Sequence, residues 1–130
     1  MRLFYLLISV WLCAISCTPA PTVAPTSKLV LEQDGLRLTI SPGHVPVETA
    51  LTLTLQAEGL ISVTGELTGA TMYMGTVPLR FSKTAENQWQ AEFFLGACSD
   101  PAMQWQLLLQ LHNSQGGSRR VAQILQSSWR

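Results

Sequence analysis

The sequence lacks the features that several large classes of protein need. It has no concentrated basic surface, because 8 lysines and arginines balance 8 aspartates and glutamates, and the one close basic pair is Arg119 and Arg120. Nucleic-acid binding is therefore disfavoured, since neutralising phosphates requires clustered positive charge. The chain also has no glycine-rich phosphate cradle, no motif that places a nucleophile beside a base, and no acidic pair suited to hydrolysis. We do not expect an enzyme.

Long apolar runs are missing as well. The apolar run over residues 6–17 follows a single basic residue, Arg2, and precedes a stretch rich in proline and threonine. It is shorter than the roughly 20 apolar residues that span a bilayer. A positive start, a short apolar stretch and small residues before a processing point are the pattern of a secretion signal that is removed.

Cys17 ends this apolar run, and the segment resembles the lipobox of bacterial lipoproteins, with Ala14 where that motif usually has leucine. The resemblance implies that Cys17 is acylated on sulfur and becomes the mature N-terminus. An ordinary secretion signal cleaved near Ala20 is the alternative. We therefore expect a signal peptide over residues 1–16, a lipidated cysteine with a Pro-rich tether over 17–28, and a folded domain over 29–130. The lipid would hold the domain at a membrane of the bacterial cell envelope, facing the periplasm or the cell exterior.

The folded part shows no sustained helical period and no internal repeat of 20–50 residues. Apolar residues alternate with polar ones instead, as in Met103, Trp105, Leu107, Leu109 and Leu111. A period of two predicts half-buried strands. About seven short strands are expected, separated by turn residues, over 36–40, 51–55, 60–68, 71–81, 87–95, 103–112 and 119–126. This spacing predicts one immunoglobulin-like antiparallel β-sandwich, although the disulfide of antibody domains is absent.

Cysteine is scarce in the expected domain. Of the three cysteines, Cys13 would leave with the signal and Cys17 would carry lipid, so Cys98 would be the single remaining thiol. An unpaired cysteine in an oxidising compartment indicates an intermolecular bond, a protected buried thiol or a metal ligand.

Three methionines accompany this thiol. Met72 and Met74 would share one face of a strand over 71–81, and Cys98 and Met103 bracket a Ser-Asp-Pro turn. These four sulfurs together would suit Cu(I), which prefers thiolate and thioether ligands, whereas thioether sulfur is a poor ligand for zinc. The same residues are equally typical of packing, since methionine fills gaps in cores and cysteine is often buried without any ligand role. A reactive thiol is the third interpretation.

The segment from Met72 to Leu79 and the preceding Gly65 to Gly69 resemble the FixH/YtkA-like domains. These are small immunoglobulin-like, membrane-tethered bacterial modules, and the resemblance covers roughly residues 36–111. It implies copper handling and assembly of respiratory oxidases, with an envelope copper protein or an oxidase subunit as partner. Met72 and Met74 match the family's Met-x-Met element, whereas Cys98 and Met103 are proposed on their chemistry alone. The competing hypotheses are a metal-free module that docks an envelope protein and a purely structural lipoprotein.

The lipid anchor gives the first testable prediction. Cys17 should carry a diacylglyceryl group, because it ends a short apolar stretch and begins the tether. Intact-mass measurement of protein extracted from membranes should show the corresponding increment. A soluble product that begins at or after Thr18 would contradict the anchor.

Overall fold

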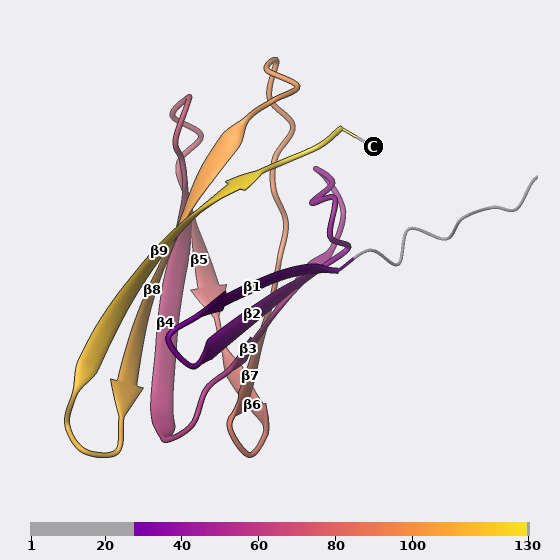
Figure 1. Ribbon diagram of the computed structural model, residues 1–130. Coiled ribbons are helices and arrows are strands. Elements are labelled where there is room, and N and C mark those ends of the chain that lie inside the picture. Colours follow the sequence, from indigo (N-terminus) through magenta and orange to yellow (C-terminus); the bar gives the residue numbers. More distant parts are fainter. Residues whose placement is uncertain (1–27, 130) are drawn as a thin grey trace, which may run out of the picture.

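Apolar and polar residues alternate along each central strand, so one face of the strand is apolar. The apolar faces of the two sheets pack against each other and form the core. The computed structural model describes residues 28–129, which form nine strands in two antiparallel sheets and no helix (Figure 1). Within this range, no helix has the length and apolarity needed to cross a bilayer. The predicted all-β sandwich is confirmed.

The strand order is that of an immunoglobulin-type sandwich. The first sheet has the spatial order β1 (Leu29–Gln33), β2 (Leu36–Ser41), β3 (Leu51–Gln56), β7 (Gln88–Phe93) and β6 (Ser82–Ala85). The second sheet has the order β5 (Thr76–Arg80), β4 (Leu60–Gly69), β8 (Gln104–Asn113) and β9 (Ser118–Gln126). Relabelling β2 to β9 as A, B, C, C′, D, E, F and G gives the sheets A-B-E-D and C′-C-F-G. β1 is an extra strand at the edge of the first sheet.

The core lies between the two sheets and is made mainly of leucine. Leu51, Leu53 and Leu55 of β3 and Trp105 and Leu107 of β8 are each at most 1% exposed. Burying a side chain of this size stabilises the fold by roughly 1.5–3 kcal/mol. The alternation read from the sequence is therefore the pattern that holds the sheets together.

The strand predicted over residues 71–81 forms only over β5, Thr76–Arg80, and the prediction was wrong over residues 71–75. The ladder between β4 and β5 ends at the pair Thr68 and Thr76, so Met72 and Met74 lie in a loop and not on a strand. Gly75 leaves the loop with a φ of 77°, which a residue with a side chain rarely adopts. After Arg80 the chain crosses to the first sheet and forms β6, and β1 was also not predicted, so the structure has nine strands and not about seven.

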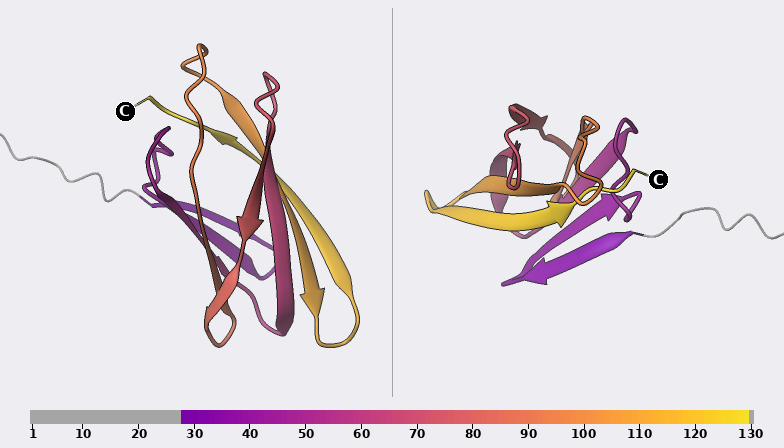
Figure 2. Two further views of the ribbon diagram at one scale, coloured as in Figure 1. Left: turned by 180° about the vertical axis from the view of Figure 1, so that it is seen from behind. Right: turned by 90° about the horizontal axis from the view of Figure 1, so that it is seen from above.

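One end of the sandwich gathers the loops that carry the predicted site. The loops over residues 42–50, 70–75 and 94–103 and the chain end at Trp129 meet there (Figures 1 and 2). Backbone hydrogen bonds join them, from Glu48 N to Leu95 O at 2.8 Å and from Val47 N to Ser128 O at 2.9 Å. These loops therefore form a connected surface and not independent tips.

The close approach of β4 and β8 at Gly65 gives a prediction about stability. A Cβ at Gly65 would lie 2.6 Å from Leu109 Cδ2 and 3.2 Å from the carbonyl oxygen of Leu108. Gly65→Ala should therefore lower the free energy of unfolding by about 1–3 kcal/mol, as overpacked cores do. Urea unfolding would measure this loss. Gly96→Ala is the matched control, because a Cβ there would make only an ordinary contact of 3.7 Å, and an equal loss in both variants would contradict the explanation.

Candidate functional site

The structure brings Cys98 and Met72 into direct contact. The Cys98 thiol donates a hydrogen bond to Met72 Sδ, with 3.4 Å between the two sulfurs, across 26 residues of sequence. Cys98 is 7% exposed and Met72 is 45% exposed, so the pair lies at the surface with the thioether outside the thiol. Two of the four predicted sulfurs are thus adjacent, in loops that follow different strands.

Met74 lies beside the loop that carries Cys98. Its side chain is half-buried against the core, and its Cε would be 3.7 Å from a Cβ placed on Gly96. Gly96 precedes Cys98 by two residues, so the third sulfur-bearing side chain reaches the same loop. A Cβ at Gly96 would make an ordinary contact with Met74, so this approach does not depend on the glycine.

Met103 occupies a different position from the other three residues. It is 1% exposed, and its Sδ accepts a hydrogen bond from Thr71 Oγ1 at 3.2 Å. Its Cε would be 2.8 Å from a Cβ on Gly69, and that Cβ would also overlap the carbonyl oxygen of Met72. Met103 therefore packs beneath the 70–75 loop as a core residue, and its partner Thr71 is the residue that precedes the exposed Met72.

Hydrogen bonds around Ser127 hold together the buried residues beneath the loops that carry the sulfurs. The indole Nε1 of Trp105 donates to Ser127 Oγ at 3.2 Å, and Ser127 Oγ in turn donates to the carbonyl oxygen of Met103 at 3.2 Å. Ser127 is 2% exposed and is the buried polar residue of the described chain. A buried hydroxyl that both donates and accepts a hydrogen bond is held in one orientation. Ser127 therefore fixes the position of the backbone at Met103.

The donor set at this end is made of sulfur. Among residues 28–129 there is no group of three or more His, Cys, Asp or Glu side chains arranged to hold a metal. A tetrahedral ion with metal–sulfur bonds of about 2.3 Å would separate two sulfur ligands by about 3.8 Å. The 3.4 Å between Cys98 Sγ and Met72 Sδ is within a few tenths of an ångström of that value, so a small opening would admit a soft ion.

Sequence reasoning did not identify the residues that shape the site. Thr71 was not singled out, although its hydroxyl contacts Met103 Sδ and accepts the backbone N–H of Gln104 at 3.2 Å. Gly69 was not singled out either, although it leaves space that the Met103 methyl group approaches. Their sequence signal was weak, because a glycine or threonine beside a loop is common for many reasons.

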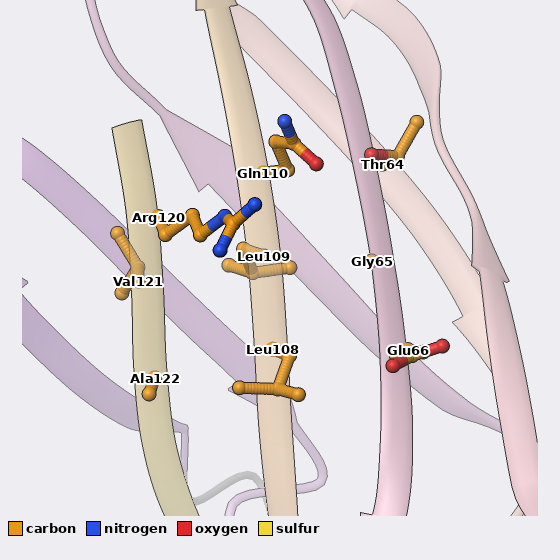
Figure 3. A pocket seen from close by; sticks show the side chains of 9 residues that line it. All are labelled: Thr64, Gly65, Glu66, Leu108, Leu109, Gln110, Arg120, Val121 and Ala122. Atoms are coloured by element: carbon orange, nitrogen blue, oxygen red, sulfur yellow. The ribbon is translucent and has the colours of Figure 1, made fainter. Parts of the chain in front are cut away.

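A second concave feature lies on the outer face of the second sheet. It has a volume of about 580 Å³ and is built by β4, β8 and β9. Leu108 and Ala122 lie in it, with Glu66 on one side and Arg120 on the other (Figure 3). The lining includes no cysteine, histidine or methionine, and it is separate from the sulfur-bearing end.

Comparisons with known proteins support the fold. No protein-family model matches the chain, and no curated protein matches it. Among solved structures, a DUF4426 family protein from Pseudomonas aeruginosa PAO1 is similar, with a TM-score of 0.52 and 11% identity over 78% of this chain and 94% of that one.

A DUF4785 family protein from Legionella pneumophila is also similar, with a TM-score of 0.53 and 16% identity over 75% of this chain. The chain spans only 29% of the length of that protein. At these identities the similarity shows a shared β-sandwich fold and nothing about activity.

The different burial of two methionines gives a prediction. Met103→Ala should cost about 2–5 kcal/mol of unfolding free energy, because it removes a buried side chain and leaves a cavity. Met72→Ala should cost much less, since its side chain is 45% exposed and surface substitutions usually change stability by about 0.5 kcal/mol or less. Thermal and urea unfolding of the two variants would measure the difference, and equal losses would show that Met72 is also a packing residue.

Proposed function

We propose that this protein is a lipid-anchored envelope lipoprotein whose sandwich domain binds Cu(I) at the sulfur-bearing end. The observation that carries the proposal is the 3.4 Å contact between Cys98 Sγ and Met72 Sδ. Strand pairing alone does not require these two loops to place sulfur against sulfur. Met72 is exposed, so an ion can reach the contact from solvent, and Met74 Cε lies near Gly96 of the loop that carries Cys98.

The chemistry of these donors favours a soft ion. Thiolate and thioether sulfur select Cu(I), and the thiolate is the stronger donor. Thioether sulfur needs no deprotonation, so Met72 and Met74 would remain ligands at low pH, whereas Cys98 must lose its proton to bind. Cys98 is therefore assigned as the principal ligand, Met72 and Met74 as supporting ligands, and Met103 as a fourth candidate that would first have to release Thr71.

The wider role follows from the expected anchor and the family resemblance. Cys17 lies outside the described residues, and its lipidation remains a prediction. With that anchor, a Cu(I)-binding sandwich fits copper delivery or the assembly of a respiratory oxidase, as the FixH/YtkA-like resemblance implies. The partner would then be an envelope copper protein or an oxidase subunit.

The alternative function is a metal-free interaction module. The concave outer face of the second sheet favours it, because Leu108 and Ala122 offer an apolar floor between charges of opposite sign at Glu66 and Arg120. Such a face could accept part of another envelope protein, with the sulfurs serving only as packing. Copper binding distinguishes the two functions.

The test is an anaerobic Cu(I) titration against a chromophoric chelator. It uses a chain carrying Cys13→Ser and Cys17→Ser, so that Cys98 is the only thiol. Cys98→Ser should weaken binding at least about tenfold, which corresponds to about 1.4 kcal/mol. Met72→Leu and Met74→Leu should weaken it by smaller factors, while each costs less than about 1.5 kcal/mol of stability.

The pH dependence supplies an internal control. Affinity should fall with falling pH in the parent chain, because the ion competes with a proton for Cys98, and this dependence should be lost in Cys98→Ser. Ser99→Ala, an exposed neighbour in the same loop, should leave affinity unchanged. If the three sulfur substitutions lower the melting temperature and do not change copper affinity, the sulfurs are packing residues and the interaction module is favoured.

A further inference from the structure

The two ends of the sandwich differ sharply in polarity. The end that carries the sulfurs exposes large apolar side chains at Met72 (45%), Tyr73 (89%), Phe94 (60%) and Trp129 (52%). The loop over 70–75 carries no charged side chain, and Asp100 is the one charged residue of the loop over 94–103. We call these two loops and Trp129 the apolar end.

The opposite end is made of polar turns. These turns lie over residues 57–59, 86–87 and 114–117, and hydrogen bonds join them from Ala57 N to Asn87 O and from Ser114 N to Gly59 O. They are rich in glycine, acidic and amide residues, and Ile61, which is 60% exposed, is the large apolar side chain near them. Of the seven large apolar side chains that are exposed in residues 28–129, four lie at the apolar end, and the other three are Val30, Ile61 and Ile124. A group of exposed apolar side chains at one end is typical of a contact site.

The chain enters the domain on the side of the apolar end. Leu29, at the start of β1, pairs with Ile40, which runs directly into the loop over 42–50. That loop is hydrogen-bonded to Leu95 and Ser128, the neighbours of Phe94 and Trp129. In Figure 1 the chain accordingly enters the first sheet beside this loop.

The tether is short enough to limit where the domain can sit. Ten residues lie between Cys17 and Lys28, and the eleven steps from Cys17 to Lys28 reach at most about 36–40 Å when fully extended. Because this segment enters beside the apolar end, that end stays within reach of the surface that holds the anchor.

We propose that the apolar end rests on the lipid surface, with Tyr73, Phe94 and Trp129 at the level of the headgroups. Tyrosine and tryptophan favour this region because their rings are apolar and their polar atoms stay in contact with water. The uncharged loop over 70–75 enters it without the cost of burying a charge. The proposal rests on the lipid anchor of the proposed function and is independent of copper binding.

Two tryptophan reporters test the proposal in the full chain purified from membranes and reconstituted into phosphatidylcholine and phosphatidylglycerol vesicles. Tyr73→Trp places a reporter at the apolar end, and Ile61→Trp places a matched exposed reporter at the opposite end. Brominated lipid should quench the added fluorescence of Tyr73→Trp and not that of Ile61→Trp. Aqueous acrylamide should quench Ile61→Trp more strongly than Tyr73→Trp. The emission of Tyr73→Trp should shift to shorter wavelength when vesicles are present.

Other outcomes would overturn the proposal in distinguishable ways. Vesicle-bound protein in which acrylamide quenches both reporters equally would show that the apolar end faces water. A Tyr73→Trp signal shielded from both quenchers would show that a protein or a second copy covers it. Failure of the chain to sediment with vesicles would overturn the anchor and the placement together, while the copper titration would remain an independent test of the sulfurs.

Discussion

The burial of one face of every central strand is the constraint on which the rest of this molecule depends. Leu53 of β3 and Leu107 of β8 are completely buried, and the strands that carry them have little freedom to present reactive groups inward. Reactive groups are therefore excluded from the space between the sheets, and the loops where the chain leaves the sheets can carry them. The Cys98 and Met72 pair lies in such loops, over a floor fixed by Trp105 and Ser127.

The sequence predicted the sheets better than the loops. Strict alternation through Trp105, Leu107 and Leu109 predicted β8, because strand periodicity is a local property. The segment from Met72 to Met74 looked like a strand on the same grounds and is a loop, since pairing stops after Thr68 and Gly75 turns the backbone. Pairing is decided by the partner strand, which a local pattern does not specify.

The candidate site was predictable as a set of residues but not as a geometry. Sulfur chemistry singled out Cys98 and Met72, and the expected sandwich allowed them to share one end. Their contact depends on the course of two loops separated by 26 residues. The hydroxyl of Thr71, which holds Met103 inside the core, has no sequence pattern of its own.

The layering of Met72 over Cys98 also determines which of the two sulfurs an oxidant reaches first. A disulfide needs two Cα atoms within about 7 Å of each other, and a thiol that is 7% exposed beneath a thioether cannot meet a second cysteine unless the loop first opens. Oxidants meet the methionine sulfur before they meet the cysteine, and methionine sulfoxide is a reversible product. The thioether of Met72 thus lies between Cys98 and solvent.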